Sequence, residues 1–216
     1  MIILNSYSGI GGNRKLWDEA EVTAVEKDKQ IAGIYSDFFP EDKIIIGDAH
    51  RYLQKHFQDF DFIWSSPPCQ THSRIRHSGY QRPNFSYDAV FPDMKLWQEI
   101  VFLKHHFKGK WVVENVIPYY EPMVRPTAVI GRHLYWSNFP IPSQEREADG
   151  IRLKHGYVTN SQKMNRFGFD LTRYHGIDKE SILNNLIDPE IGLQLLSTAF
   201  RWQQKELIEM GAIEDE

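Results

Sequence analysis

Short apolar runs that alternate with helix-like segments constrain the fold of this chain more than any other feature. The runs occupy residues 2–7, 22–26, 43–48, 60–66 and 110–115, and helix-like segments lie at 13–20, 27–39, 49–57 and 94–107. Apolar strands separated by helical patterns indicate βαβ units and a parallel sheet that is covered on both faces. We therefore predict a Rossmann-like α/β fold with a mostly parallel sheet.

The pattern becomes less regular after residue 126. Two further strands are expected at 127–130 and 133–139, and helical periodicity returns at 178–186 and at 190–210, where Pro189 is a helix-start signal. Between them lies a stretch containing Gly, Arg and Asn. We predict one domain built from residues 1–142 and 177–216, with a small insert at 143–176.

Composition limits the setting of the protein. The 216 residues include one cysteine, which excludes a disulfide framework and favours a reducing, cytoplasmic compartment. The start of the chain lacks a basic segment before its apolar residues, and no apolar run is long enough to cross a bilayer. We expect a soluble protein without a secretory signal. The net charge of −4 means that any binding of nucleic acid must use a local basic patch.

Three predicted strand ends carry residues suited to a nucleotide-like ligand, and ligands of such sheets bind beyond the carboxyl ends of the strands. The turn SYSGIGGNR at 6–14 is rich in glycine, Glu26 ends the second strand, and Asp48 ends the third. A carboxylate at the second position can accept both hydroxyls of a ribose, and one at the third can accept from an adenine amino group. A tight turn, a solvated charge and a helix N-cap are the structural alternatives. NAD and S-adenosylmethionine both remain possible at this point.

The fourth strand end holds the only cysteine of the chain, in the stretch SSPPCQ at 65–70. Proline fixes φ and lacks an N–H donor, so the Pro-Pro turn is stiff and holds Cys69 in one position facing the crevice. Most lone cysteines are inert core residues. A stiff turn at a strand end suits a nucleophile better.

Together these motifs resemble those of the C5-cytosine methyltransferases. The glycine turn SYSGIGG, the stretch SSPPCQ and the stretch VVENV at 112–116 occur in the order and spacing of that family. The resemblance covers about 1–137, with a fainter match at 178–200. It implies a methyltransferase fold with S-adenosyl-L-methionine as cofactor, bound by Tyr7, Ser8, Gly9, Ile10, Gly11, Gly12, Glu26, Lys27, Asp48, Ala49, Pro68 and Asn185.

The resemblance also implies a covalent mechanism, in which Cys69 adds to C6 of cytosine and makes C5 electron-rich. Charge then moves toward N3, where Glu114 would supply a proton. Arg132 falls where the family places a basic group that contacts O2 of the base. No metal is implied, and the base that removes the C5 proton stays unassigned. Amino-group methyltransferases carry an aromatic residue at the position of Cys69, so this chain favours carbon as the methyl acceptor.

A target base in duplex DNA must leave the helix before C6 can be reached. The segment 71–91 is long for a loop in a compact α/β fold, and we predict that it closes over the base. The predicted contacts to nucleic acid are Gln70, Ser73, Arg74, Arg76, Arg82 and Arg166.

The insert at 143–176 is much shorter than the target-recognition region of bacterial members of the family, so we expect a target of two or three bases. Such a compact enzyme suits a bacteriophage or a mobile element. We expect a monomer that binds double-stranded DNA in a bacterial or phage-infected cytosol, without a membrane. The alternatives are the same C5 chemistry on tRNA, and a non-catalytic or dinucleotide-binding Rossmann protein.

Overall fold

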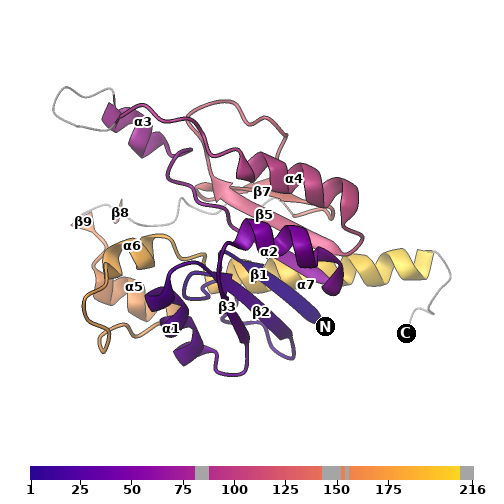
Figure 1. Cartoon of the computed structure of the whole chain (residues 1–216), viewed down its shortest axis with the longest axis horizontal. Coiled ribbons are helices and arrows are strands. Elements are labelled where there is room, and N and C mark those ends of the chain that lie inside the picture. The colour runs from indigo at the N-terminus through magenta and orange to yellow at the C-terminus, as the bar shows by residue number, and fades with distance from the viewer. Residues whose placement is uncertain (81–87, 143–151, 154–155, 210–216) are drawn as a thin grey trace.

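A twisted sheet forms the centre of the computed structural model, which describes residues 1–80, 88–142, 152–153 and 156–209 (Figure 1). Within these residues the sheet has seven strands in the order β3-β2-β1-β4-β5-β7-β6. The strands are β1 (Ile2–Ser6), β2 (Glu21–Glu26), β3 (Lys43–Ile46), β4 (Phe62–Ser65), β5 (Lys110–Val116), β6 (Ala128–Ile130) and β7 (His133–Ser137). β1 to β5 are parallel, and β7 is antiparallel to both of its neighbours. The order β3-β2-β1-β4-β5 is that of a Rossmann fold, so the predicted fold class is confirmed.

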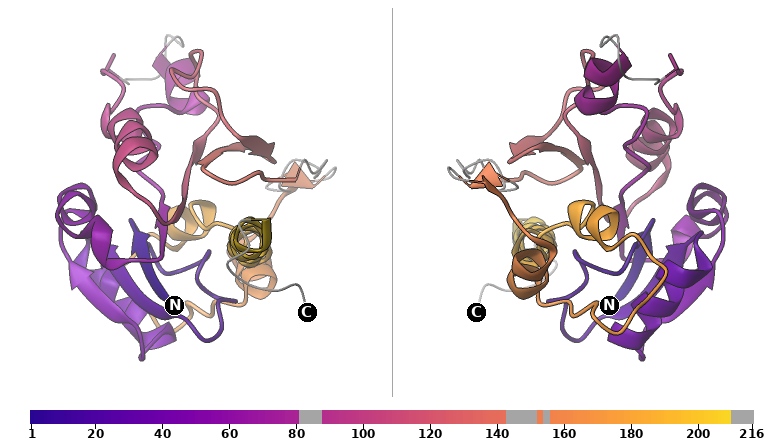
Figure 2. Two further views of the ribbon diagram at one scale, coloured as in Figure 1. Left: turned by 90° about the vertical axis from the view of Figure 1, so that its right-hand side faces the viewer. Right: turned by 90° about the vertical axis from the view of Figure 1, so that its left-hand side faces the viewer.

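Helices cover both faces of this sheet. The helices of the described residues are α1 (Lys29–Phe38), α2 (Ala49–His56), α3 (Arg74–Tyr80), α4 (Lys95–His106), α5 (Asn160–Phe167), α6 (Lys179–Asn184) and α7 (Pro189–Glu209). A 3-10 turn lies at Phe57–Asp59, and β8 (Arg152–Leu153) and β9 (Gly156–Tyr157) form a short hairpin. α2 and α4 pack on the face that carries Leu4, whereas α7 packs on the face that carries Ile3. Figure 2 shows α4 and α7 on opposite sides of the sheet.

The helix predicted at 13–20 is wrong. Residues 7–20 form a series of turns, with i to i+3 backbone bonds such as Trp17 N to Arg14 O at 2.9 Å. The space for a helix on this face is taken by α7, whose Gly192 approaches so closely that an added Cβ would lie 2.1 Å from the backbone oxygen of Asn13. α7 therefore replaces the helix that would otherwise connect β1 to β2.

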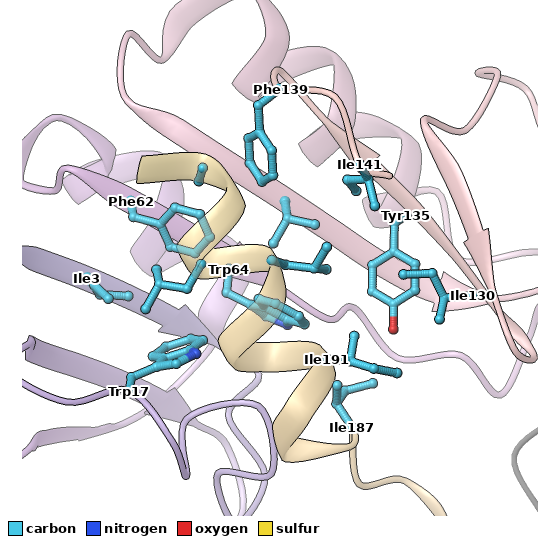
Figure 3. Close-up of a cluster of buried hydrophobic side chains, with 14 of the residues drawn as sticks. Ile3, Trp17, Phe62, Trp64, Ile130, Tyr135, Phe139, Ile141, Ile187 and Ile191 are labelled. Carbon is cyan, nitrogen blue, oxygen red and sulfur yellow. The ribbon is translucent and has the colours of Figure 1, made fainter. Parts of the chain in front are cut away.

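The core on the α7 face combines aliphatic and aromatic side chains. Trp17, Trp64 and Tyr135 are almost fully buried there beside Ile187 and Ile191, and the close-up in Figure 3 shows α7 passing alongside them. The rings of Trp17 and Trp64 lie 6.0 Å apart. Aromatic pairs at such distances contribute roughly 0.5–1.5 kcal/mol beyond their burial, so the turn at residue 17 is anchored without a helix of its own.

The predicted insert at 143–176 has a described part that belongs to the main core. Residues 143–151 and 154–155 lie outside the described residues, but Phe169 and Leu171 are fully buried with Ile10 and Ile34. The division of the chain at 143 and 176 stays a prediction. No helix in the described part of the chain has both the length and the apolar character needed to cross a bilayer.

Candidate active site

The glycine turn follows β1 and opens toward the carboxyl end of the sheet. Tyr7, Gly9 and Gly11 have positive φ angles of 58°, 55° and 85°. A Cβ on Gly9 would meet nothing within 4 Å, whereas one on Gly12 would lie 2.5 Å from the backbone oxygen of Ile187. Gly9 thus borders open space where a ligand can approach the backbone, and Gly12 permits close packing on the segment after α6.

Two other predicted cofactor residues of this turn point elsewhere. The side chain of Ile10 is buried in the core with α1, so only its backbone can face a ligand. Ser8 is buried as well, and its amide donates to the backbone oxygen of Val25 at 3.0 Å. The turn is therefore tied to β2 through its backbone.

Glu26 connects the end of β2 to the glycine turn. Its Oε2 accepts from the amide of Gly9 at 3.1 Å, and its Oε1 accepts from the amide of Asp28 at 2.9 Å. Each oxygen keeps a further lone pair, because an ionised carboxylate can accept about four hydrogen bonds. Glu26 can therefore fix the glycine turn and still accept from a ribose, while the adjacent Lys27 is exposed.

Asp48 is the N-cap of α2 and accepts from the amide of Arg51 at 3.2 Å. Burial opposes ionisation there, but the backbone bond from Arg51 and the charge of Lys95 outweigh it and lower the pKa of Asp48. Ala49 is buried against the sheet. Since β1, β2 and β3 are neighbours, Gly9, Glu26 and Asp48 lie along one edge of the sheet, as predicted for an adenosine-containing cofactor.

Pro67 and Asn115 hold the turn that carries the thiol. Pro67 is buried, and its carbonyl oxygen accepts from Nδ2 of the buried Asn115 at 2.8 Å. Pro68 is exposed and Cys69 is partly exposed. The carbonyl of Cys69 accepts from the amides of His72 and Ser73 at 3.0 and 3.1 Å. The turn is thus fixed on both sides of the sulfur.

Glu114 lies on β5, the strand beside the one that ends in this turn. Burial raises the pKa of Glu114 from 4.5 to about 7, against the opposing effects of a hydrogen bond from Ser66 and the charge of Arg132. Nε2 of His133 is 3.5 Å from its Oε1. Burial and Arg132 lower the pKa of His133 to about 3, so this histidine is neutral and the contact is not an ion pair.

Cys69, Glu114 and Arg132 influence one another electrostatically. Burial and the charge of Glu114 raise the pKa of the Cys69 thiol, while a backbone hydrogen bond and Arg132 act in the opposite direction. Protonation of Glu114 removes one of the two effects that disfavour the thiolate. Arg132 also donates to the carbonyl of Asn184, and its Nε has no hydrogen-bond partner among the described residues. The structure therefore brings the three predicted catalytic residues together.

Asn185 is the C-cap of α6 and is exposed. Its Nδ2 donates to Oγ of Ser181 at 3.5 Å, and it precedes by two residues the Ile187 that contacts Gly12. This places the α6–α7 connection next to the glycine turn. A contact of Asn185 with the cofactor stays a prediction.

The segment predicted as a loop at 71–91 contains α3, which projects from the body of the protein in Figure 1. Gln70 and Arg74 are exposed, and Nε of Arg74 donates to the carbonyl of Pro118 at 3.0 Å. Ser73 and Arg76 line a hollow beside Tyr119, next to the turn of Cys69. Arg82 lies outside the described residues.

Arg166 lies on α5 and forms an ion pair with Asp188 at 3.2 Å. It shares a hollow with Arg132 and His133, and Lys163 on the same helix donates to Oδ1 of Asn184 at 2.6 Å. Arg132, which directly precedes β7 and is predicted to contact the base, and Arg166 on α5, which is predicted to contact nucleic acid, are therefore neighbours.

Residues that the sequence did not assign complete the site. Ser66 accepts from Nε1 of Trp64 at 2.9 Å and donates to Glu114, and Asn115 anchors the Pro-Pro turn. Asn115 belongs to the stretch VVENV, so its place in the motif was the available signal. Within the described residues no group of three or more metal-ligating side chains occurs.

The family is decided by the match between this chain and a family model. The model for C-5 cytosine-specific DNA methylase matches residues 1–117, more than half of the 216 residues. The chain belongs to this family. The cofactor that this family implies is S-adenosyl-L-methionine, and the open space at Gly9 beside Glu26 fits it. No curated protein matches the methylase significantly.

Solved structures resemble the methylase at low identity. TrmN from Thermus thermophilus is 15% identical over 53% of this chain and 33% of its own, with a TM-score of 0.34. A mutant of Spodoptera frugiperda DNMT2 is 18% identical over 72% of this chain and 56% of its own, with a TM-score of 0.42. A putative methyltransferase, yhhF from Escherichia coli, is 16% identical over 68% and 76%, with a TM-score of 0.38. The methylase thus spans about a third of the TrmN chain.

Proposed function

We propose that this methylase transfers a methyl group to C5 of a cytosine turned out of duplex DNA, with Cys69 as covalent nucleophile. One observation carries the proposal. The partly exposed thiol of Cys69 lies at the end of a strand adjacent to that of Glu114, close enough for the charge of this carboxylate to raise the pKa of the thiol. A nucleophile beside a carboxyl group that is half protonated near neutral pH suits addition to a ring that must gain a proton.

In the first half of the reaction the thiolate of Cys69 forms a bond to C6, and the C5–C6 double bond gives up its electron pair. Glu114 donates its proton to N3, which neutralises the charge that moves there. The pKa of about 7 leaves Glu114 with a proton to give. Arg132 adds a positive charge near Cys69 and Glu114, and its Nε, which has no hydrogen-bond partner among the described residues, can donate to O2.

In the second half S-adenosylmethionine, which the glycine turn and Glu26 would hold, would supply the methyl group to C5 and leave as S-adenosylhomocysteine. A base then removes the C5 proton, the bond between Cys69 and C6 breaks, and the proton on N3 returns to Glu114. The ring regains its double bond, and the thiolate is restored. Asn115 keeps the sulfur in place throughout, because it anchors the preceding turn at Pro67.

We assign the approach of DNA to the surface around α3. Gln70, Ser73, Arg74 and Arg76 lie there beside the thiol turn, with Arg74 exposed. Arg166 lies apart from them on α5, in the hollow that it shares with Arg132. Neutralising phosphates with arginines predicts binding that weakens as salt is added. We expect a monomer that reads two or three bases, and sequencing of the methylated DNA checks the target length.

Covalent trapping tests the proposal. Fluorine cannot leave C5 as a cation, so DNA with 5-fluorocytosine should remain attached to Cys69 in the presence of S-adenosylmethionine, and denaturing electrophoresis should show the adduct. Cys69→Ala should form none while still binding cofactor, and Glu114→Gln should form it more slowly. An adduct with Cys69→Ala equal to that of the wild type, or no adduct with any nucleic acid, would overturn the proposal.

Parallel reactions with duplex DNA and with tRNA separate the two substrate classes. The proposal expects duplex DNA to be trapped faster. Faster trapping of tRNA would keep the C5 chemistry and replace DNA with RNA.

A further inference from the structure

Glu99 is a buried carboxylate that belongs to none of the motifs described above. It lies on α4 with 1% of its surface exposed, among the apolar residues Leu96, Ile100 and Leu103 that pack on the sheet. Burying a carboxylate is costly unless it is hydrogen-bonded, and packing alone would favour an apolar residue here. The burial of Glu99 is therefore tolerated only because its carboxylate has hydrogen-bond partners.

The partners of Glu99 come from three strand ends. Its Oε1 accepts from the hydroxyl of Tyr7 at 2.6 Å and lies 2.8 Å from Nδ1 of His50, and its Oε2 accepts from the hydroxyl of Ser65 at 2.5 Å. Tyr7 begins the glycine turn, and His50 follows Asp48 by two residues. Ser65 ends β4, four residues before Cys69.

The hydrogen bond to Glu99 stabilises an unusual backbone conformation of Tyr7. Its φ of 58° is in the left-handed region, which is strained for a bulky residue. A hydrogen bond to a charged group is stronger than one to a neutral group, so the bond to Glu99 can hold the backbone of Tyr7 in that conformation. The hydrogen bond and the charge of Glu99 likewise favour the protonated form of His50 and raise its pKa, with burial acting against them.

We propose that Glu99 is a positioning residue that couples the cofactor loops to the turn of Cys69. Oε1 of Glu99 holds Tyr7 and His50, and Oε2 holds Ser65. A movement of Tyr7 or His50 therefore shifts the carboxylate and changes its hydrogen bond to Ser65, and a movement of Ser65 changes the bonds to Tyr7 and His50 in the same way. Binding of cofactor and placement of the thiol are linked through this group, and the linkage is reciprocal.

Two measurements that use no nucleic acid test the coupling, so its failure is distinct from failure of the proposed function. The first is the Kd for S-adenosylhomocysteine by calorimetry. The second is the rate at which iodoacetamide alkylates free enzyme, which reports on Cys69 alone because the chain has no other cysteine. Among the described residues, Glu114 and Arg132 are the charged groups that shift the pKa of Cys69, and the variants below leave both in place, so a changed rate indicates a changed position of the thiol.

The decisive results are the cross effects, meaning the effect of a cofactor-side substitution on alkylation of Cys69 and the effect of a thiol-side substitution on the Kd for S-adenosylhomocysteine. Tyr7→Phe, which removes only a hydroxyl on the cofactor side, should speed alkylation of Cys69 about threefold or more. Ser65→Ala, on the thiol side, should raise the Kd about threefold or more. Both cross effects should vanish in a Glu99→Gln background, and Gln98→Ala, at an exposed position of the same helix, should change neither quantity.

Effects confined to each variant's own side would overturn the proposal, because they would make Glu99 two independent contacts. Cross effects that persist in the Glu99→Gln background would overturn it as well. Should Glu99→Gln fail to fold, the cross effects of Tyr7→Phe and Ser65→Ala decide the question alone.

Discussion

Replacing Glu114 with Gln should make the protein more stable at neutral and alkaline pH while it slows the adduct-forming step. Glu114 is 6% exposed, and burial raises its pKa from 4.5 to about 7. The difference corresponds to about 3 kcal/mol, since one pKa unit is about 1.4 kcal/mol. This is the free energy by which the fold disfavours the ionised carboxylate, and a neutral amide of the same shape avoids it.

The pH at which the effect develops follows from the two pKa values. In the unfolded chain the carboxyl loses its proton near 4.5, whereas in the folded chain it keeps the proton to about 7. The folded state binds more protons in this interval, so the free energy of unfolding of the wild type falls as the pH rises through it. Glu114→Gln lacks this dependence. Its stability relative to the wild type should therefore increase by about 3 kcal/mol from about pH 4 to pH 8.

Urea unfolding followed by tryptophan fluorescence at several pH values measures the difference. The neighbouring His133, with a pKa lowered to about 3, contributes equally to both proteins and cancels. Glu41→Gln, at an exposed position between α1 and β3, is the matched control and should show no such trend. A Glu114→Gln protein with the same stability difference at pH 4 and pH 8 would refute the burial argument.

Four further substitutions test the packing and the binding groups. Gly12→Ala places a Cβ 2.5 Å from a backbone oxygen and should lower the free energy of unfolding by about 1–3 kcal/mol. Gly33→Ala, in open space on α1, should raise the free energy of unfolding by about 0.5–1 kcal/mol. Urea titrations of both variants check these values. Asn115→Ala removes the anchor of the Pro-Pro turn and should slow trapping of 5-fluorocytosine, so an unchanged trapping rate would contradict its role. Glu26→Gln should raise the Kd for S-adenosylmethionine about tenfold or more in calorimetry, because it weakens bonds to a charged acceptor; equal affinities would exclude Glu26 from the cofactor site.

Local patterns predicted much of the fold and of the site. The strands around Ile3, Ile63 and Val113 were predicted from their apolar runs, because a strand buried on both faces must be apolar along its length. Cys69 and Glu114 were predicted together from the resemblance to the C5-cytosine methyltransferases, whose motifs the stretches SSPPCQ and VVENV resemble. α3 was missed because Arg74–Tyr80 carries little apolar periodicity, and the helix at 13–20 was predicted from a local pattern that the packing of α7 overrules.

By itself, the amino-acid sequence determined the parallel sheet, the glycine turn and the stiff Pro-Pro-Cys turn, since each depends on the conformational preferences of contiguous residues. Only the tertiary structure decided that α7 covers the β1 face, that Ser66 and His133 surround Glu114, and that Glu99 meets Tyr7, which is 92 positions away in the chain. Such contacts depend on how whole elements pack, and a pattern of neighbouring residues does not encode which distant side chain a buried polar group will meet.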